Sequence, residues 1–425
     1  MALILQTDAD PIRIGIVGCG RILPAHLRGY RLLREAGYDD FRITALVARK
    51  LDDALMFRQR GVGPTPRPPV SLDSSDSLGA PHLYVSDFQP EQLPDVFTSV
   101  EEMLASGSVD AVDITASLPV HHTIGLRCLA AGKHLMVEKP MAITVKAASL
   151  MVEAAESAGL ALGVMENVRF QEAVRLSRWA IERGEIGRVQ MLAAISLGTG
   201  EWSPDRVVAD TPWRHLKLEA GGGASIDIGV HLAHRLRYLA GEIRSMTAIA
   251  RVFEPERQLR DAEGHVFGRV SADADDAFFA LPEFESGAIG TISFTWAGHG
   301  EPTGLPEGVT IYGDHGCLKG ATLIRDGGEH VSLPTLFDSE AEADVREAFF
   351  PRGVTDTFAL AYRDWLNAIR SGHQPEMNGH EGLRDLATAF AIMESATAHG
   401  PVFVDDVLDG YVDQYQHPIN ANYGL

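Results

Sequence analysis

Cysteine is scarce in this chain. Its 425 residues include three cysteines, Cys19, Cys128 and Cys317, and no two of them form a CxxC pair. A sparse, odd and widely spaced set argues against a disulfide scaffold and against a structural zinc site, and we expect no metal. It fits a reducing compartment, so we expect a cytoplasmic protein.

Long apolar runs and an excess of positive charge are also missing. No stretch approaches the ~20 apolar residues of a membrane helix, and the start of the chain does not resemble a signal peptide. Acidic residues outnumber basic ones by 58 to 37, giving a formal net charge of −21. Because this field repels phosphate backbones and anionic lipid, we expect neither a nucleic-acid nor a membrane partner.

The first part of the chain alternates strand and helix patterns. This alternation predicts a doubly wound parallel sheet, a Rossmann domain, over residues 1–166. The expected strands are Ile12–Val17, Phe41–Ala48, Ala111–Thr115, His134–Val137 and Leu160–Met165, and the expected helices are Ile22–Ala36, Asp52–Arg60, Val100–Ala105, Thr123–Ala131 and Val145–Ala158.

The alternation is interrupted between Gly61 and Pro94. Four prolines and the polar run Ser71–Ser77 predict a long loop or insertion, with at most a short strand near Leu83–Val85. Because the segment joins a helix to the next strand, we expect it at the sheet edge away from the carboxyl ends of the strands. A surface insertion or subunit contact is therefore preferred to a lid.

The second part of the chain, residues 167–425, has a different pattern. Several alternating strands follow one another without intervening helices, which predicts an α+β domain with an open, mostly antiparallel sheet. The expected strands are Val189–Leu197, Met246–Phe253, Ala277–Glu283, Ala288–Trp296 and Val309–Gly313, and the expected helices are Val174–Arg183, Gly229–Leu239, Thr355–Arg370 and Gly382–His399.

A glycine turn, Gly18-Cys19-Gly20, joins the first strand to the first helix. Such a turn aims backbone N–H groups and the positive end of the helix dipole at one point, which suits a pyrophosphate. Gly18 permits the tight turn and Gly20 lets the phosphate approach. The third glycine of the dinucleotide fingerprint is absent, because Leu23 stands there, so the turn by itself also fits an ordinary strand–helix connection.

The end of the second strand bears on the choice between NAD and NADP. NAD-binding proteins commonly place a carboxylate there for the ribose 2′-hydroxyl. This chain has Arg49 and Lys50, which could pair with a 2′-phosphate, so we favour NADP. Asp52 or Asp53 could still reach the ribose, which leaves NAD open.

The stretch Ala131–Pro140, AGKHLMVEKP, closely resembles a signature of the Gfo/Idh/MocA oxidoreductases. Further stretches are similar to that family's motifs: the turn at Gly18–Gly20 with His26, Pro119-Val120-His121, Asn167–Phe170, Trp213-Arg214 and Gly221–His231. The resemblance implies a Rossmann domain followed by an open antiparallel sheet that binds substrate and often mediates assembly into a homodimer or homotetramer.

The resemblance also implies the site. His231 is expected as the catalytic acid or base, Lys139 assists it, and Asp227 holds substrate hydroxyls; the spacing of four places Asp227 and His231 on one face of a helical turn. The expected cofactor-binding residues are Gly18, Gly20, Arg21, Ile22, Arg49, Lys50, Thr115, His121, Glu138 and Asn167. The expected substrate-binding residues are Lys139, Arg169, Trp213, Arg214, Asp227 and His231.

Two histidine features of the sequence call for a separate interpretation. The pair His121-His122 could suggest a metal, but no acidic ligand pattern accompanies it, so one cofactor-side contact and one helix-start residue fit better. Residue 234, which is often acidic in the family that the chain resembles, is His234 here. That departure bears on helix packing or a substrate contact.

These observations favour an NAD(P)-dependent enzyme that reversibly oxidises a secondary alcohol of a sugar, cyclitol or related polyol. Two alternatives remain. One is a glycosidase in which NAD oxidises the sugar transiently and elimination cleaves the glycosidic bond. The other is a non-catalytic NADP-binding sensor, although Lys139, Asp227 and His231 would have no purpose in it.

Overall fold

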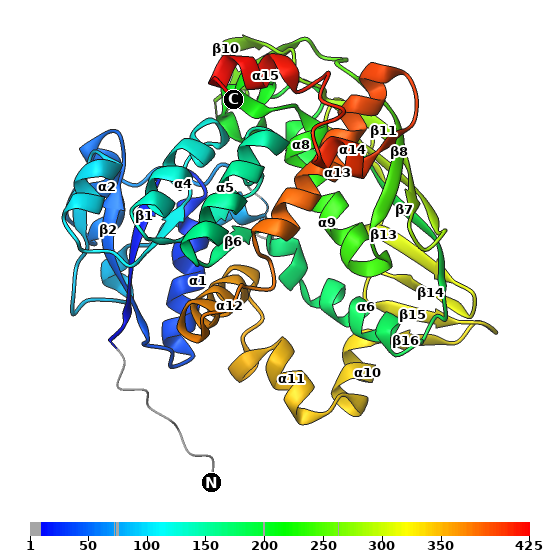
Figure 1. Ribbon diagram of the computed structural model, residues 1–425, viewed down its shortest axis with the longest axis horizontal. Coiled ribbons are helices and arrows are strands. Elements are labelled where there is room, and N and C mark those ends of the chain that lie inside the picture. The colour runs from blue at the N-terminus through cyan, green and yellow to red at the C-terminus, as the bar shows by residue number, and fades with distance from the viewer. Residues whose placement is uncertain (1–9, 72, 74–75, 199, 262) are drawn as a thin grey trace.

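The computed structural model describes residues 10–425 except residues 72, 74, 75, 199 and 262. Residues 1–9, where no signal peptide is expected, and part of the polar run Ser71–Ser77 lie outside the described residues. Two sheets dominate the molecule, one formed by the first part of the chain and one by the second (Figure 1).

The first sheet is parallel and has six strands in the order β3-β2-β1-β4-β5-β6. Apart from the edge strand β3, its strands are short apolar runs that are largely buried on both faces, as parallel strands covered by helices must be. They are β1 Ile12–Val17, β2 Phe41–Val47, β3 Asp95–Phe97, β4 Ala111–Ile114, β5 His134–Glu138 and β6 Leu162–Met165, joined by α1 Leu23–Glu35, α2 Leu51–Arg58, α3 Val100–Ala105, α4 His121–Ala130 and α5 Val145–Ala158. The strand order reverses between β1 and β4, so a crevice opens at their carboxyl ends.

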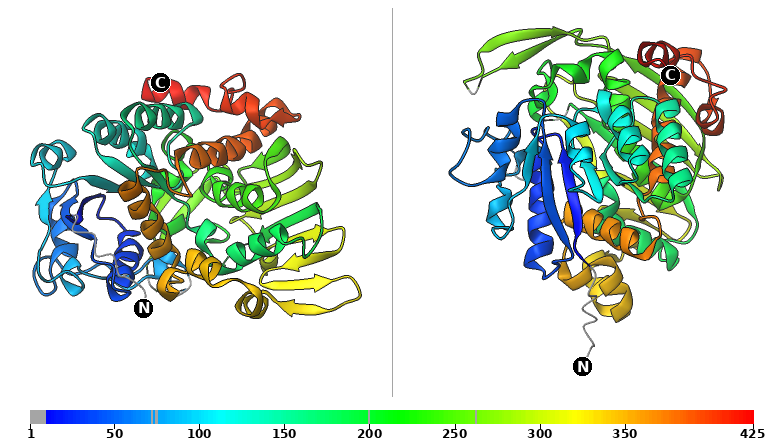
Figure 2. Two further views of the ribbon diagram at one scale, coloured as in Figure 1. Left: turned by 60° about the horizontal axis from the view of Figure 1, so that its bottom comes forward. Right: turned by 60° about the vertical axis from the view of Figure 1, so that its left-hand side comes forward.

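The second sheet has nine strands in the order β16-β15-β14-β13-β7-β12-β11-β8-β17. All neighbours are antiparallel except β7 and β12, which confirms the expected mostly antiparallel sheet. The strands are β7 Val189–Leu197, β8 Ile243–Arg251, β11 Ala277–Phe284, β12 Ile289–Thr295, β13 Thr303–Gly313, β14 Gly316–Lys319, β15 Thr322–Arg325, β16 His330–Ser332 and β17 Val402–Phe403. A separate hairpin, β9 Glu256–Arg260 and β10 Val266–Ser271, projects from the body (Figure 2).

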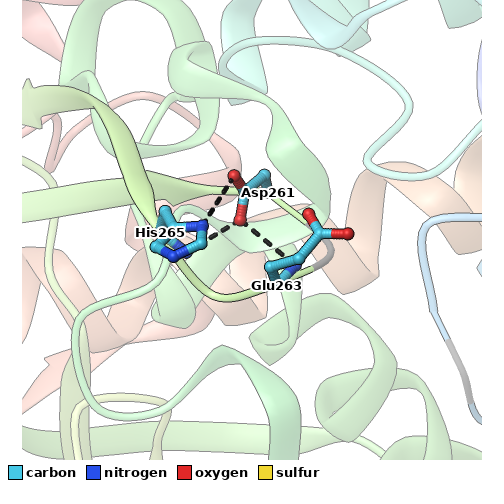
Figure 3. Close-up of side chains that lie close together, drawn as sticks. All are labelled: Asp261, Glu263 and His265. Carbon is cyan, nitrogen blue, oxygen red and sulfur yellow. Dashed lines mark hydrogen bonds and ion pairs between the residues drawn. The ribbon is translucent and has the colours of Figure 1, made fainter.

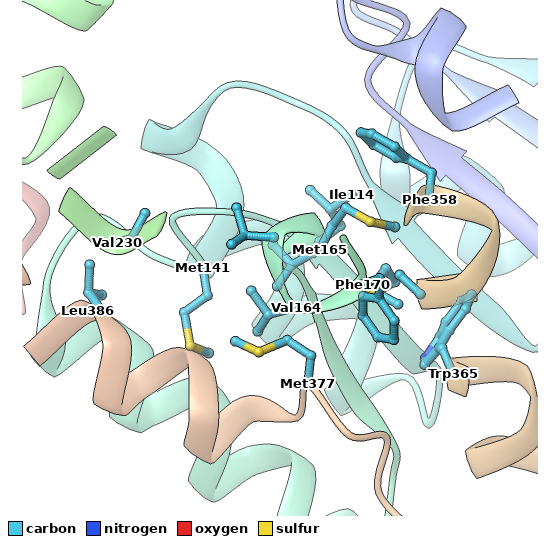
Figure 4. Packing of buried hydrophobic residues seen from close by; sticks show 14 of the residues in the cluster. Ile114, Met141, Val164, Met165, Phe170, Val230, Phe358, Trp365, Met377 and Leu386 are labelled. Carbon is cyan, nitrogen blue, oxygen red and sulfur yellow. The ribbon is translucent and has the colours of Figure 1, made fainter. Parts of the chain in front are cut away.

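Helices of the second part cover one face of the large sheet and also return to the first sheet. They are α6 Glu172–Glu182, α7 Lys217–Ala220, α8 Ala224–Asp227, α9 Gly229–Ala240, α10 Leu333–Glu340, α11 Ala343–Phe349, α12 Thr357–Ser371, α13 Gly379–Ala398, α14 Val404–Leu408 and α15 His417–Tyr423. Helix α12 packs against α1, and α13 packs against both α5 and β8. Figure 4 shows part of this shared core, where Met141 and Val164 meet Met377 and Leu386.

The segment between α2 and β3 differs from its expectation. No strand forms at Leu83–Val85; a 3₁₀ turn occupies Val85–Asp87 instead, and the third strand of the sheet is β3. His82 Nε2 contacts the carbonyl oxygen of Met56, and its ring lies 4.6 Å from that of Phe57. These contacts fix the segment along α2.

Candidate active site

A cavity of about 550 Å³ lies between the two sheets. Its walls come from the carboxyl ends of parallel strands, from the helices α8 and α9, and from the large sheet. Its lining includes Ile22, His121, Glu138, Lys139, Asn167, Trp202, Trp213, Arg214, Asp227, His231 and Trp296. Topology therefore brings most of the expected site residues to one place, although they span more than half of the chain.

The glycine turn has the geometry of an anion-binding turn. Gly18 has a φ of +115°, and a Cβ there would lie 2.4 Å from the backbone nitrogen of Ala116, so a larger residue cannot occupy the position. A Cβ on Gly20 would meet nothing within 4 Å. Packing within the protein therefore explains the first glycine but leaves open space beside the second.

The backbone beside that space is ready to bind a ligand. Among the described residues, no hydrogen bond takes the N–H groups of Gly20, Arg21 or Ile22, which precede the first turn of α1. Thr115 closes the turn from the side, because its hydroxyl donates to the carbonyl oxygen of Gly18. Free N–H groups at a helix start next to an open glycine fit the pyrophosphate of a dinucleotide.

Glu138, at the end of β5, is held by a buried network behind the cavity. His26 Nε2 donates to Glu138 Oε1 at 2.8 Å, and His26 Nδ1 donates to the hydroxyl of Tyr362, which in turn donates to Asp113. Burial lowers the pKa of His26, but its hydrogen bonds and charge interactions with Asp113 and Glu138 outweigh this and raise it to about 9. An imidazolium therefore balances two carboxylates beneath the site.

Lys139 and Asp227 meet in the cavity. Lys139 Nζ donates to the Asp227 carbonyl oxygen at 2.8 Å and to its carboxylate Oδ1 at 3.1 Å, and Arg214 Nε donates to Oδ2 at 3.2 Å. Burial raises the pKa of Asp227, but the charges of Lys139 and Arg214 outweigh it and lower that pKa well below the usual range. The carboxylate therefore stays ionised and orients both cations.

His231 is oriented by Glu166, a residue that the sequence reasoning missed. His231 Nδ1 lies 2.6 Å from Glu166 Oε1, and that same oxygen accepts the backbone N–H of Val168 at 3.1 Å. Burial raises the pKa of Glu166, but His231 outweighs it and lowers the pKa to about 2. An ionised Glu166 makes Nδ1 the hydrogen-bond donor, so Nε2 of a neutral imidazole carries the free lone pair. The sequence did contain an indication that Glu166 is functional: it directly follows β6, and functional side chains of a parallel sheet gather at the carboxyl ends of its strands.

The pairing of Asp227 with His231 differs in detail from the expectation. Both line the cavity, but α8 ends at Asp227 and α9 begins at Gly229, so no single helix carries them. The glycines before α8 serve a different contact: a Cβ on Gly223 would lie 1.7 Å from the carbonyl oxygen of Asp275, so only glycine lets that segment approach so closely.

Three further histidines singled out in the sequence, His121, His122 and His234, each contact other residues of the protein. His121 spans the carbonyl oxygens of Ala116 and Pro140, each at 2.9 Å. His122 instead packs against the ring of Tyr423, and His234 Nδ1 lies 2.8 Å from Asp385 Oδ2, so neither ring joins His121. The histidine pair therefore does not converge on one point.

Arg169 is the expected substrate-binding residue that the structure does not bring to the cavity. Its Nε donates to Glu376 at 3.3 Å, its guanidinium lies 3.7 Å from Glu381, and it stacks over the ring of Tyr238. These contacts hold the guanidinium of Arg169, on η4 (Asn167–Phe170), against α9 and the start of α13.

The segment Gly61–Pro94 does not stay at the far edge of the sheet, and that expectation is wrong. Residues 76–78 line the cavity beside Ile22. Arg67 Nη1 donates to the carbonyl oxygen of Cys19 at 3.3 Å, and Arg21 Nη1 donates to that of Pro68 at 3.4 Å. An ion pair of Arg67 with Asp53 in the first turn of α2 holds this stretch beside the glycine turn.

In the part of the chain that the structure describes, one group has the spacing of metal ligands: Asp261, Glu263 and His265, all exposed at the β9–β10 turn (Figure 3). Asp261 Oδ1 accepts the backbone N–H groups of Glu263 at 3.1 Å and His265 at 2.7 Å. These bonds are the usual way in which an aspartate closes a turn. None of the three residues lines the cavity.

Comparison with known proteins agrees with this geometry. Residues 12–166 match the model of an oxidoreductase family with an NAD-binding Rossmann fold, and residues 174–319 match the GFO/IDH/MocA C-terminal domain. Levoglucosan dehydrogenase from Pseudarthrobacter phenanthrenivorans is 32% identical over 323 residues, covering 70% of this chain and 81% of that protein. The 1,5-anhydro-D-fructose reductase of Ensifer adhaerens is 29% identical over 299 residues, with the same two coverages.

A solved structure of levoglucosan dehydrogenase in complex with NADH and levoglucosan has the same fold. It matches 93% of this chain and 99% of its own, with a TM-score of 0.69 and 22% sequence identity. With both family models matched and a relative above 30% identity, the chain belongs to the Gfo/Idh/MocA family of oxidoreductases.

Proposed function

We propose that the protein is a nicotinamide-dependent dehydrogenase that reversibly oxidises a secondary alcohol of a sugar, cyclitol or related polyol. The observation that carries this proposal is the convergence of His231 and Lys139 on one cavity, next to a glycine turn with free N–H groups. The names of the two sequence relatives, an anhydrosugar reductase and an anhydrosugar dehydrogenase, support the substrate class.

His231 is the proposed acid and base. Its Nε2 makes no hydrogen bond with a described residue, while Nδ1 is tied to the ionised Glu166. The pair therefore suits removal of a hydroxyl proton at Nε2, with the positive charge that develops on the ring stabilised by Glu166. In the reverse direction, the imidazolium returns the proton to the alkoxide.

Lys139 is the proposed second catalytic group. Its ammonium has two hydrogen bonds to Asp227, which leaves one N–H for a substrate oxygen in the cavity. A cation there stabilises the negative charge that builds on the oxygen as its proton leaves. Asp227, held by Arg214, fixes the direction of that ammonium.

Aromatic side chains shape the rest of the cavity. Trp202, Trp213 and Trp296 all line it, and the Arg214 guanidinium lies 4.5 Å from the centre of the Trp213 ring. Flat indole faces suit the C–H faces of a sugar or cyclitol ring, while Asp227 and Arg214 suit its hydroxyls.

The dinucleotide is proposed to lie along the crevice, with its pyrophosphate on Gly18–Ile22 and its nicotinamide ribose near Glu138. When bound, the nicotinamide supplies the acceptor for the hydride that leaves the substrate carbon. We propose NADP as the preferred cofactor, because Arg49 and Lys50 are exposed at the end of β2 and their side chains have no partner among the described residues.

We also propose that the protein assembles as a homodimer or homotetramer through the open face of the large sheet. Among the described residues of β7, β8, β11, β12 and β13, six apolar side chains on this face are more than a third exposed: Met191, Ile249, Phe279, Leu281, Ile289 and Tyr312. Strand register places them on one side of β7, β8, β11, β12 and β13. A second copy of the same face is the simplest cover for such a patch.

A turnover screen tests the proposed activity. The purified protein is mixed with NAD or NADP and a panel of sugars, anhydrosugars and cyclitols, and reduced nicotinamide is followed by its near-ultraviolet absorbance. We expect reduced nicotinamide to accumulate with at least one alcohol. Lys139→Met and His231→Asn should each lower kcat by at least about 100-fold. Cleavage of a glycoside without net reduction of the cofactor would contradict the proposal and favour a glycosidase.

A further inference from the structure

Arg67 occupies a position that the function described so far does not use. It lies on the segment between α2 and β3, and its side chain reaches back across the carboxyl ends of β1 and β2. One nitrogen donates to the carbonyl oxygen of Cys19 in the glycine turn at 3.3 Å, and another pairs with Asp53 in the first turn of α2. The guanidinium therefore bridges the glycine turn and the helix that follows β2.

This bridge spans the place where a doubly wound sheet holds the adenosine ribose. In such folds the pyrophosphate lies on the first βα turn and the ribose 2′ position points to the end of the second strand. Arg67 lies between these two landmarks. The side chains of Arg67 and Asp53 are each about one third exposed. The guanidinium is thus accessible at the edge where the ribose 2′ position is expected.

The charges around it fit a phosphate better than a neutral hydroxyl. Arg49 and Lys50 stand at the end of β2, are exposed, and make no side-chain hydrogen bond or ion pair with the described residues. With Arg67 they place three cations beside two carboxylates, Asp52 and Asp53, in a chain of net charge −21. A local excess of positive charge in so acidic a protein favours binding of an anionic ligand at this point.

We propose that Arg67 is the residue that determines cofactor specificity, by turning from Asp53 to form a bidentate hydrogen-bonded pair with the 2′-phosphate of NADP. The proposal rests on the proposed function and deepens its choice of cofactor. A planar guanidinium matches two phosphate oxygens, which a lysine at this point could not do. The ion pair with Asp53 is partly exposed, so solvent screening leaves it easy to exchange for a phosphate dianion.

The segment that carries Arg67 is thereby part of the cofactor site. Arg21, which donates to Pro68, ties the same stretch to the turn that binds the pyrophosphate. The chain after α2 is therefore folded back over the adenosine end of the crevice, and its length is what lets an arginine far from β2 in sequence reach the 2′ position.

Binding of cofactor fragments tests this directly. Calorimetry measures the affinity of 2′,5′-ADP and of ADP for the full-length protein, for Arg67→Ala and for Arg67→Lys. We expect the wild-type protein to bind 2′,5′-ADP at least about 10-fold more tightly than ADP. Arg67→Ala should remove at least about 10-fold of the 2′,5′-ADP affinity and change that for ADP by less than about threefold, with Arg67→Lys between them.

Arg60→Ala is the matched control, because Arg60 lies on the same segment and pairs with Asp87 away from the glycine turn. It should leave both affinities unchanged. An equal loss for both fragments in Arg67→Ala, or equal affinity of the wild type for both, would overturn the proposal. Fragment binding involves no turnover, so a protein without alcohol oxidation could still pass this test, and a failed test would leave oxidation with NAD intact.

Discussion

Replacing Glu166 by glutamine tests the proposed catalytic role of the His231 imidazole and its orientation. Glu166 is buried and is not part of the cavity lining, so it acts on the substrate only through His231. The substitution keeps the size of the side chain and removes its charge. If the amide nitrogen faces Nδ1, it donates to that atom and leaves the proton on Nε2, where the lone pair is needed.

The expected effect is large because both functions of the carboxylate are lost. A wrong tautomer and an unstabilised imidazolium together should lower kcat by about 10²- to 10⁴-fold. This corresponds to roughly 3 to 5 kcal/mol of transition-state stabilisation. The affinity for the dinucleotide should stay within about threefold, since Glu166 is a positioning residue and not a cofactor contact.

Steady-state kinetics of three variants separate this role from a structural one. Glu166→Gln and His231→Asn are compared singly and together, with the melting temperature of each as a check on folding. Because the two residues act as a unit, the double variant should be hardly slower than His231→Asn alone. A Glu166→Gln protein that melts normally and keeps kcat within about fivefold of the wild type would refute the reasoning.

Three further outcomes follow from the geometry. Gly20→Ala should melt like the wild type but lose most of its dinucleotide affinity in a titration, whereas Gly18→Ala should lower the melting temperature, because its Cβ would strike the backbone of residue 116. Stability should fall in alkali: the pKa of His26 is raised to about 9, so its contribution is complete below the unfolded value near 6.5 and is lost as the pH rises through 9. Denaturant unfolding at about pH 6 and about pH 10 should show a loss of up to about 3 kcal/mol, and an unchanged or higher stability at the alkaline pH would contradict it. Lys139→Arg should keep the ion pair with Asp227 yet lose at least about 10-fold in kcat, measured at saturating substrate.

The elements of the fold could be predicted from the sequence wherever local periodicity and burial agree. The strands Ile12–Val17 and Val189–Leu197 and the helix Val145–Ala158 have the expected bounds, because each is a long, uninterrupted pattern. Short pieces were missed: β3 has three residues, and β14, β15 and β16 have three or four residues each. These last three strands add one after another to β13, so their pairing depends on the neighbouring strand more than on their own pattern.

The site was predictable where a motif fixes it and unpredictable where distant contacts do. Lys139, Asp227 and His231 could be placed at one site because the sequence motifs mark them. Glu166 could not be paired with His231, because 65 residues separate them and only the packing of η4 on α9 brings them together. The return of Arg67 to the glycine turn likewise depends on contacts with α2 that no periodicity records.

The most direct test of the central claim is isotope transfer from the alcohol to the cofactor. A polyol found active in the screen is labelled with deuterium at the oxidised carbon and incubated with the protein and its dinucleotide, and mass spectrometry follows the label. We expect one deuterium on each reduced nicotinamide formed and slower turnover with the labelled substrate. Reduced nicotinamide without deuterium, or product formation that leaves the dinucleotide unlabelled, would contradict it.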